Sequence, residues 1–582
     1  MKLLALPAHL AARRPAWLDV LICGFLPGAL TGTLLSGLLF FLNPDLSLTP
    51  LSLVRMAFAY GGLLGLGSLL VELPFTYRQP RRARRLLPWG LTAAMTVTAI
   101  LYGGHASYFA FYLPPGINER LIRASLPLSA MALVAFYTAL LHSVHRRRYG
   151  RRSQWLFVVL CILSVYVMVE RRQAFRPSPQ RPRLSTPATE VARPQLLFVG
   201  LESATLDAIL PLAEQGRLPF IATMLREGTY GRLACLEPYR RTSMWASLAT
   251  GKYPYKHGLV DNRLYPLGWL TDGQPLRLLP AWMAFRRWGT LGFAALPVDQ
   301  RSSRSLNLWQ ILNRQGLAAG MVAWPNTNPV PEELSFALSE PFFDEPQTPE
   351  SSWPGEVAER ALLFQLSVED IDPQLVARFG ADPGPEVLEA LAGDLWRESL
   401  TMFLLEHHRD AQALFLVLPG LRKVSRSYYG GYSAAQFEGS QQASEQRAAE
   451  IVSAYYNHLD SFLNQLWLRS EGPKVLVLAS AGGMQEFRGL RRAWRWLWPQ
   501  SLLDGTQQAS PDGALLLYGT GIRPATQLSD AELVDVVPTL LYGLGYPVAR
   551  DLDGKVLTSA FQPALLAQQP LTFVPSYEPQ PP

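Results

Sequence analysis

The sequence predicts an N-terminal all-α bundle of transmembrane helices followed by an α/β/α sandwich. Five apolar runs precede residue 170, and beyond residue 195 short apolar runs alternate with helical patterns. Hydrophobic residues make up 49% of the 582 residues and charged residues only 17%, which is low for a wholly soluble protein. The same composition excludes a disordered or a collagen-like chain.

The five apolar runs predict about five membrane helices within residues 1–172. The runs are Val20–Leu42, Leu51–Val71, Trp89–Leu113, Leu126–Leu141 and Trp155–Val169. The first three are long enough to cross about 30 Å of hydrocarbon. The last two, of 16 and 15 residues, are short for a span.

The loops between these runs alternate in charge. The N-terminus and the second and fourth loops together carry 13 Lys and Arg, whereas the first and third loops carry 2. The positive-inside rule then predicts a cytoplasmic N-terminus, and five spans put the C-terminal domain outside the inner membrane. Arg171, Arg172 and Arg176, which follow the fifth run, disagree with this alternation.

The basic pI of about 9.2 does not indicate a nucleic-acid partner, because the positive charge lies between the apolar runs. Residues 1–183 carry a net charge of +16, and the rest of the chain carries −9. Of the three cysteines only Cys235 lies in the globular part, which excludes a cysteine-based zinc site there.

Arg55 and His105 are polar residues in or near the predicted spans. One interpretation is a proton or ligand path. The other, which we favour because the runs contain no carboxylate partner, is that Arg55 extends to the interface and His105 bonds a neighbouring helix.

A proline-rich linker, residues 173–194, separates the membrane part from a domain at 195–565, and a tail follows at 566–582. Buried strands are predicted at Gln195–Leu201, Gly320–Trp324, Ala413–Leu418, Val475–Ala479 and Ala514–Tyr518. Helical patterns cover Thr205–Glu227, 384–409, 443–469 and 532–544. This alternation predicts a sheet with helices on both faces.

Two further segments carry an expectation. Phe487–Pro499 (FRGLRRAWRWLWP) fits either a contact with a membrane surface or an anionic glycan, or a half-buried strand with outward arginines. The acidic run Glu332–Glu350 is expected to be a solvated loop.

Several segments of the globular half resemble a known family. They include LATGKYPYKHG, LFLVLPGLRKVSR, KVLVLASAGGM and VDVVPTLLYGLGYP followed by DLDGKVL, in this order. They resemble the type I phosphodiesterase/nucleotide pyrophosphatase branch of the alkaline phosphatase superfamily, over about residues 195–562. The layout with five N-terminal spans also resembles the phosphoethanolamine transferases and lipoteichoic acid synthases of that superfamily. The resemblance implies an alkaline phosphatase-like sandwich.

The resemblance also implies a site at which two zinc ions, held by about six Asp and His ligands, activate a Thr or Ser nucleophile. The first ligand position corresponds to Glu202. The nucleophile, ten residues before Gly251 of the ATG motif, corresponds to Arg241, and Thr242 is adjacent. The asparagine that stabilises the oxyanion corresponds to Asn262.

The other five ligand positions hold residues that do not bind zinc, and no replacement motif is present. In chain order they are Arg422, Arg426, Ala481, Gly482 and Ala509. We therefore expect no zinc and no other cofactor. The remaining histidines are expected to be surface or helix-capping residues.

The sequence thus favours a membrane-anchored pseudoenzyme that acts as a structural, assembly or anion-binding subunit of a membrane complex. Its expected partners are the lipid bilayer and other proteins of that complex, with an anionic headgroup or glycan as a further candidate. The alternative is an active membrane phosphodiesterase or phosphoethanolamine- or phosphoglycerol-type transferase with a non-standard site and Thr242 as nucleophile.

The vacated metal site is a candidate anion pocket. Arg241, Arg422 and Arg426 are expected at the C-terminal ends of the strands, with Asn262 beside them, and guanidinium groups match phosphate or carboxylate geometry. The alternative, which we favour slightly, is that the arginines pair with Glu202 and fill the space.

Overall fold

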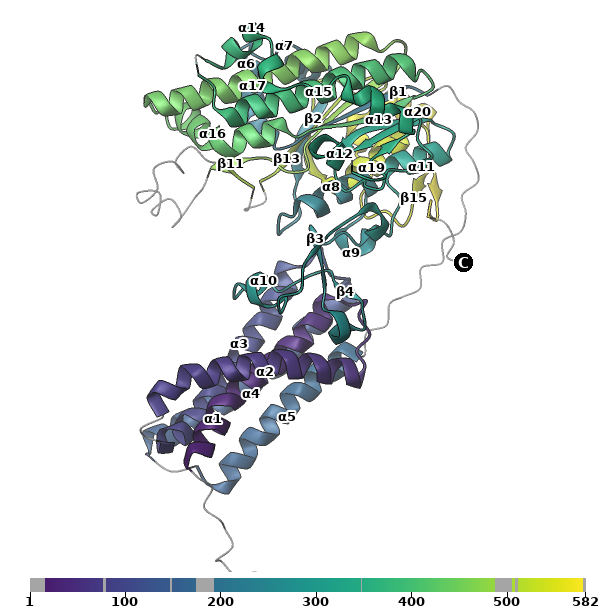
Figure 1. Ribbon diagram of the computed structural model, residues 1–582. Coiled ribbons are helices and arrows are strands. Elements are labelled where there is room, and N and C mark those ends of the chain that lie inside the picture. The colour runs from purple at the N-terminus through teal and green to yellow at the C-terminus, as the bar shows by residue number, and fades with distance from the viewer. Residues whose placement is uncertain are drawn as a thin grey trace, which may run out of the picture. The chain divides into compact units, whose positions relative to one another are not determined.

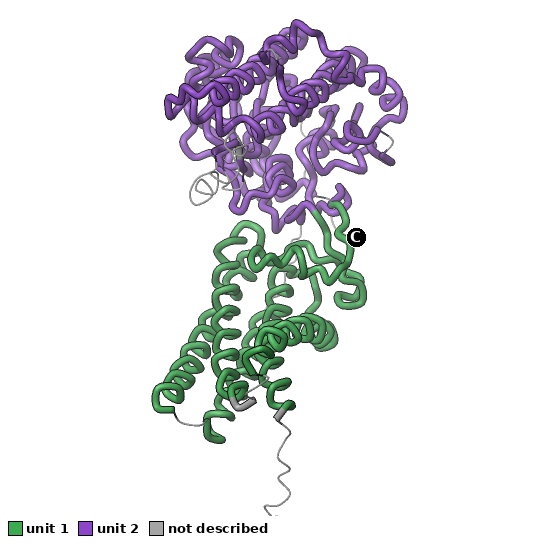
Figure 2. Tube along the Cα trace, turned by 60° about the vertical axis from the view of Figure 1, so that its left-hand side comes forward, with its two compact units in different colours: residues 1–179, 263–297 green, residues 180–262, 298–582 purple. Residues whose placement is uncertain are grey.

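The computed structural model describes residues 16–76, 80–146, 149–173, 193–346, 348–380, 382–486, 505–507 and 511–578. It divides into two compact units (Figure 2). Unit 1 comprises residues 1–179 and 263–297, and unit 2 comprises residues 180–262 and 298–582. The sequence pattern had placed residues 263–297 inside the C-terminal domain, so their membership of the membrane unit is a difference from the prediction.

Among its described residues, unit 1 contains five helices that are long and apolar enough to cross a membrane. They are α1 (Ala16–Leu42), α2 (Pro50–Thr76), α3 (Pro80–Tyr108), α4 (Pro115–Val144) and α5 (Arg151–Gln173). The fourth and fifth have 30 and 23 residues, so the runs that looked short are the apolar centres of full-length helices. Polar residues at both ends of these helices had hidden their true length.

Helices α1 and α2 pack closely against each other at small residues. A Cβ atom at Gly28 would overlap the carbonyl oxygen of Leu64, and one at Gly32 would overlap that of Tyr60. Gly24, Gly28 and Gly32 form a Gly-xxx-Gly series, and such series allow membrane helices to approach backbone to backbone. The series is visible in the sequence, although we did not predict a helix contact from it.

Arg172, near the end of α5, is buried and donates three hydrogen bonds. Its Nε bonds the Phe40 carbonyl at 2.8 Å, and its Nη2 bonds the carbonyls of Pro44 and Leu46 at 2.8 and 2.9 Å. These carbonyls belong to the end of α1 and the loop after it, where intrahelical donors are missing. Arg172, whose position disagrees with the alternation of basic and non-basic loops, therefore has a structural role.

Residues 263–297 form an insert that packs on the helices of unit 1. Its elements are β3 (Arg263–Pro266), a 3₁₀ turn (Gly268–Thr271), β4 (Pro275–Leu276), α10 (Phe285–Trp288) and β5 (Leu296–Pro297). β3 pairs antiparallel with both β4 and β5, which brings the two ends of the insert together. The backbone N–H of Val298 also donates to the Asn262 carbonyl.

Unit 2 is built on a nine-stranded mixed sheet, in the order β14-β2-β13-β10-β1-β9-β6-β7-β8. In chain order its strands are β1 (Gln195–Leu201), β2 (Thr229–Ala234), β6 (Ala319–Trp324), β7 (Phe336–Ser339), β8 (Ser352–Trp353), β9 (Ala413–Leu418), β10 (Lys474–Ala479), β13 (Gly513–Gly519) and β14 (Thr526–Glu532). β1 is central and pairs in parallel with β9 and β10. The five predicted strands are confirmed.

Helices cover both faces of this sheet, as predicted (Figure 1). One face carries α6 (Leu206–Glu214), α7 (Pro219–Glu227), α15 (Pro385–His407), α16 (Gly420–Phe437) and α17 (Ala443–Arg469). The other carries α8 (Arg241–Thr250), α11 (Leu308–Arg314) and α19 (Val536–Gly543). The shorter helices are α9 (Pro254–His257), α12 (Glu340–Asp344), α13 (Gly355–Leu362), α14 (Pro373–Val376) and α20 (Pro563–Gln568).

Alternate residues of β1 serve the two faces. Leu197, Val199 and Leu201 join the large core beneath α15–α17. On the other face Phe198 lies 5.3 Å from Trp324, and Trp324 lies 5.3 Å from Trp245 of α8 between ring centroids. Gly200 has no room for a Cβ because the Trp245 ring occupies that position.

Three local predictions need comment. The helix expected over Thr205–Glu227 is two helices, because Gly216 has a φ of +73° and Pro219 starts a new helix. The acidic run Glu332–Glu350 is not a solvated loop, since it contains the buried strand β7 and the helix α12 with Phe342 and Phe343 inward. Phe487–Pro499 lies outside the described residues.

The C-terminal tail is bound to unit 2 as far as residue 578. Residues Phe573–Val574 (β16) pair with Val548–Ala549 (β15). The carboxylate of Glu578 accepts hydrogen bonds from Lys252 Nζ at 2.8 Å and from the Leu306 N–H at 3.0 Å.

Candidate functional site

The candidate site lies at the carboxyl ends of β1 and β9. Glu202 directly follows β1, and Arg422 lies in the first turn of α16, which follows β9. Arg241 is the first residue of α8. Because β1 and β9 are parallel neighbours, their C-terminal ends meet at one edge of the sheet, where sites of such sheets lie.

Glu202 binds both arginines. Its Oε1 accepts from Arg241 Nε at 2.6 Å, and its Oε2 accepts from Arg422 Nε at 2.5 Å. The glutamate is only 2% exposed, so both oxygens are removed from water. Each oxygen of Glu202 therefore has an arginine as its partner.

A second carboxylate completes the cluster. Arg241 Nη1 and Nη2 donate to Glu340 at 3.0 and 2.5 Å, so one guanidinium joins two glutamates. Glu340 is the first residue of α12, directly after β7. We call Glu202, Arg241, Arg422 and Glu340 the arginine–glutamate cluster. With two charges of each sign it is neutral.

The charges of this cluster shift its pKa values. Burial alone would raise the pKa of Glu202, but Arg241 and Arg422 outweigh it and hold that pKa below its usual value. Burial likewise opposes the charge of Arg241, yet Glu202 and Glu340 raise the pKa of that guanidinium. Glu202 and Arg241 therefore remain ionised near neutral pH.

Thr242, the neighbouring hydroxyl, is turned to another partner. Its Oγ1 donates to Asn326 Oδ1 at 3.1 Å, and the side chain is buried. Asn326 has a left-handed backbone, with a φ of +60°. The hydroxyl thus donates to an amide oxygen, which is not a base that could activate it.

Two of the expected anion-binding residues stay outside the cluster. Arg426, one helical turn beyond Arg422, is exposed and has no hydrogen-bonding or ionic partner among the described residues. The side chain of Asn262 is exposed as well. Of the three arginines expected to converge, the structure brings together Arg241 and Arg422, and both pair with Glu202, as the alternative interpretation held.

One of the remaining ligand positions, Gly482, has no space for a larger side chain. A Cβ at Gly482 would overlap the ring of Tyr239, which occupies the side of the site where the resemblance places a histidine. Ala481 is buried beside it. Ala509 lies outside the described residues. Within the part of the chain that is described, no three His, Cys, Asp or Glu residues are grouped to hold a metal ion.

Two histidines differ from the expectation of a surface or capping role. His257 is buried, its Nδ1 accepts from the Leu259 N–H at 3.2 Å, and its Nε2 lies 3.0 Å from Ser247 Oγ. Burial lowers the pKa of His257 to about 3, so the ring is neutral, with the proton on Nε2. The ring therefore donates to Ser247 and does not act as its base.

His458 is the second buried histidine of unit 2. It belongs to a group of buried polar side chains that contacts the first residue of α16. Its Nε2 lies 3.0 Å from Glu398 Oε1. In the same group Asp394 accepts from the Gly420 N–H at 3.1 Å and from the Tyr455 hydroxyl at 2.8 Å. Burial raises the pKa of Asp394 to about 6.

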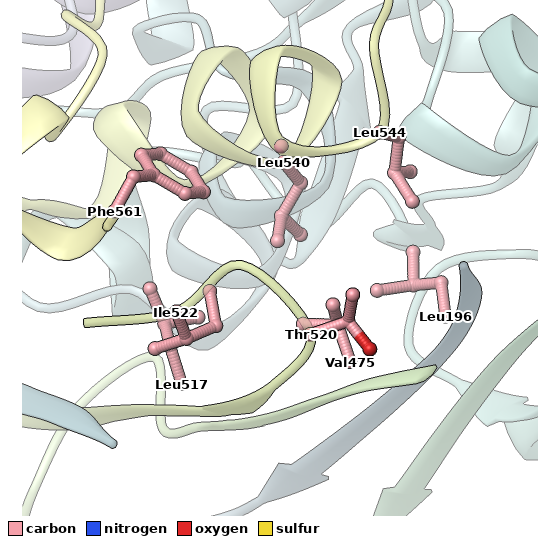
Figure 3. Close-up of a pocket in the computed structure, with 9 residues that line it drawn as sticks. Leu196, Val475, Leu517, Thr520, Ile522, Leu540, Leu544 and Phe561 are labelled. Carbon is pink, nitrogen blue, oxygen red and sulfur yellow. The ribbon is translucent and has the colours of Figure 1, made fainter. Parts of the chain in front are cut away.

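The small cavity in Figure 3 is not a functional site. It encloses about 10 Å³ on the α19 face of the sheet, between Leu196, Val475, Leu540 and Phe561. The oxygen drawn in red belongs to Thr520, and the other labelled side chains are hydrocarbon. Such a space holds at most one water molecule.

Glu340, Asn326 and Tyr239 were not predicted from the sequence. Glu340 lies in a run that we took for a loop, and the other two follow no motif. A strand assignment for Phe336–Ser339 would have placed Glu340 at a strand end, which is the one available signal.

Comparisons with known proteins give one family match and several similar solved structures. A family model described as type I phosphodiesterase/nucleotide pyrophosphatase matches residues 196–504. None of the curated proteins compared with the chain matches it. Among solved structures, wild-type alkaline phosphatase PafA is similar at 12% identity, 64% coverage of this chain, 100% of its own and a TM-score of 0.39. Murine ectonucleotide pyrophosphatase/phosphodiesterase 5 is similar at 11% identity. The match covers 63% of this chain and 100% of that protein's chain, with a TM-score of 0.36.

The family model covers more than half of the chain and includes Glu202, Arg241 and Arg422. The five apolar helices lie outside the match. The chain therefore belongs to the type I phosphodiesterase/nucleotide pyrophosphatase family.

Proposed function

We propose that this protein is a membrane-anchored pseudoenzyme that serves as a subunit of a membrane complex. The observation that carries the proposal is the arginine–glutamate cluster. Arg241 stands at the nucleophile position and Arg422 at a ligand position, and both bind Glu202, the last residue able to act as a ligand. The cluster is neutral and internally bonded, so it needs no metal ion for stability.

Zinc content and phosphodiester hydrolysis by the purified full-length chain test the proposal. We expect substoichiometric zinc after dialysis against zinc and no turnover of bis-(p-nitrophenyl) phosphate above the buffer rate. Thr242→Ala is the matched variant, because it removes the hydroxyl that an active site would use and leaves the cluster intact. About two zinc ions per chain, as in two-metal sites, with turnover lost in Thr242→Ala, would contradict the proposal.

We propose in addition that this subunit binds an anion through Arg422 and Arg426. Arg422 uses only its Nε on Glu202, and both side chains reach solvent. Titration calorimetry with inorganic phosphate on wild type and on Arg426→Ala checks this part, since Arg426 lies outside the cluster. We expect several-fold weaker phosphate binding in the variant, and equal affinity would remove this part of the proposal.

We further propose that unit 2 lies on the outer side of the inner membrane. The loop charges support this orientation. Arg172 is one of the three arginines after the fifth run that disagree with it, and its hydrogen bonds to three carbonyls give it a structural role instead. Cys235 is a poor reporter, because it donates to two carbonyls and burial raises its pKa to about 12.

An introduced cysteine tests the orientation better. In a chain with its native cysteines replaced by alanine, Glu471→Cys on unit 2 should react with an impermeant maleimide in cells whose outer membrane is permeabilised. Arg85→Cys, near the start of α3 in the basic segment predicted to be cytoplasmic, should react only after lysis. The reverse pattern would show that the orientation is wrong. Proteins that copurify with the full chain in mild detergent would identify the complex.

A further inference from the structure

The insert of residues 263–297 holds to the helices of unit 1 through polar side chains that lie within those helices or at their ends. The Asn43 side chain donates to the Leu278 carbonyl at 2.8 Å and accepts from the N–H groups of Arg277 and Leu278 at 2.7 and 2.9 Å. His105 Nε2 accepts from the Ala281 N–H at 3.0 Å. These bonds satisfy main-chain groups of the insert as secondary structure would.

The insert also reaches along α2. The Tyr60 hydroxyl donates to the Gly289 carbonyl, and its ring stacks on Phe285 with centroids 5.8 Å apart. Tyr60 is ten residues beyond Pro50, about 15 Å along the helix. The insert therefore lies beside a membrane-length helix as well as at its end.

On α2 the exposed apolar face continues into the insert. Leu51, Val54 and Phe58 are exposed, and their spacing puts them on one helix face together with Arg55. Arg55 Nη1 donates to the Trp269 carbonyl at 3.1 Å and to Asp272 at 2.6 Å. The Trp269 side chain, next to this contact, is 60% exposed.

The same continuity occurs on α3. Ile100, Gly104 and Tyr108 lie four residues apart on one face, and Ile100 is 62% exposed. The Trp282 ring covers Gly104, where a Cβ would overlap it, and lies 5.9 Å from the Tyr108 ring. Trp282 is itself partly exposed, and Met283 and Phe293 add further exposed apolar surface.

From these contacts we propose that residues 263–297 form a membrane-interface element whose exposed side chains lie among the lipid headgroups and upper acyl chains. Trp269 and Trp282 extend the two helix faces that must meet lipid, and tryptophan is the side chain typical of that layer. Arg286 and Arg287, both exposed on α10, place cationic groups beside them, as suits headgroup phosphates. The occupant of this surface is thus the bilayer.

The depth of spin labels in lipid nanodiscs tests this inference on the full-length chain. Met283→Cys and Phe293→Cys are labelled separately in the cysteine-free background, because both side chains are exposed and the labels need not disturb the helix contacts. Phe58→Cys, at a position 77% exposed on α2, is the lipid reference, and Glu471→Cys on unit 2 is the aqueous reference.

We expect the ratio of oxygen to nickel-chelate accessibility at residues 283 and 293 to be several-fold higher than at residue 471 and to approach that at 58. A ratio equal to that at 471 would mean that the insert is in water. Shielding of both labels from both reagents would mean that protein covers the surface. Either result would overturn the inference.

Discussion

Arg241 and Arg422 place two guanidinium groups at the carboxyl ends of the central strands. Each guanidinium is fixed to a carboxylate, Glu202 or Glu340, by directed hydrogen bonds. An arginine pair of this kind holds charge and shape but provides neither a Lewis acid nor a metal-bound nucleophile.

Replacing Glu202 by glutamine should lower the free energy of unfolding of unit 2 by roughly 3–5 kcal/mol, because two guanidinium groups lose a buried counter-ion. Thermal unfolding of the full chain in detergent measures the change. The pKa of Glu202 is lowered by folding, so its stabilising effect is present above pH 4.5 and is lost as pH falls below that value. Glu359→Gln, at an exposed position, should leave stability unchanged at every pH.

Asp394 should have the opposite pH dependence. Its pKa rises from 3.8 to about 6 on folding, so its contribution is present below pH 3.8 and is lost as pH rises through 6. The charged groups around it are Arg397, Glu398 and His458. Asp394→Asn should therefore gain stability relative to wild type between pH 4 and pH 7.5, by up to about 3 kcal/mol.

Denaturation of wild type and of Asp394→Asn at pH 4 and at pH 7.5 checks this expectation. Asp382→Asn is the control, because that carboxylate is 93% exposed. A difference between Asp394→Asn and wild type that is the same at pH 4 and pH 7.5 would show that Asp394 does not titrate in this range.

At single positions the sequence was informative where a residue follows a recognisable strand or, as for Arg241, lies at a fixed distance from a motif. Glu202 follows an apolar run and Arg422 follows another, so parallel pairing brings them together. Glu340 belongs to the same cluster but follows β7, and β7 and β10 lie on opposite sides of β1 in the sheet. The residues around Glu340 in the sequence do not show that its side chain meets Arg241. The partner of an ion pair between distant segments depends on tertiary packing.

At the level of elements, the contact between α1 and α2 depends on glycine. Replacing Gly28 with alanine should lower the yield of monodisperse protein and its melting temperature in detergent, because the new methyl group meets the Leu64 backbone. Gly62→Ala on α2 is the matched control, since no atom lies within 4 Å of its added Cβ. Equal behaviour of the two variants would contradict a glycine-dependent contact.

The predicted elements differ in how well they were found, for physical reasons. The five strands were found because strands buried on both faces are continuous apolar runs. Strand β7 was missed because its four residues lie within an acidic segment, and we gave the charge more weight than the short apolar run. Arg55 was expected to extend to the interface and His105 to bond a neighbouring helix, whereas in the structure both side chains bond the insert.

At the level of the whole molecule, the sequence predicted two parts joined by one linker. The structure has the chain pass between the two units at three places, near residues 179, 262 and 297. The insert contains no long apolar run, and its attachment depends on Asn43, Tyr60 and His105, which are far away in sequence. Sequence patterns alone could not reveal this.

The triple connection has a consequence for proteolytic release. A specific protease site introduced after Pro187 would cut only one of the three crossings, so unit 2 should stay in the membrane fraction after complete cleavage and a high-salt wash. A control chain in which a short Gly/Ser loop replaces residues 263–297 should release its fragment into the supernatant. Release from both chains would contradict the connection through the insert. If unit 2 is retained as expected, a single cut in the linker cannot shed this domain as a soluble fragment.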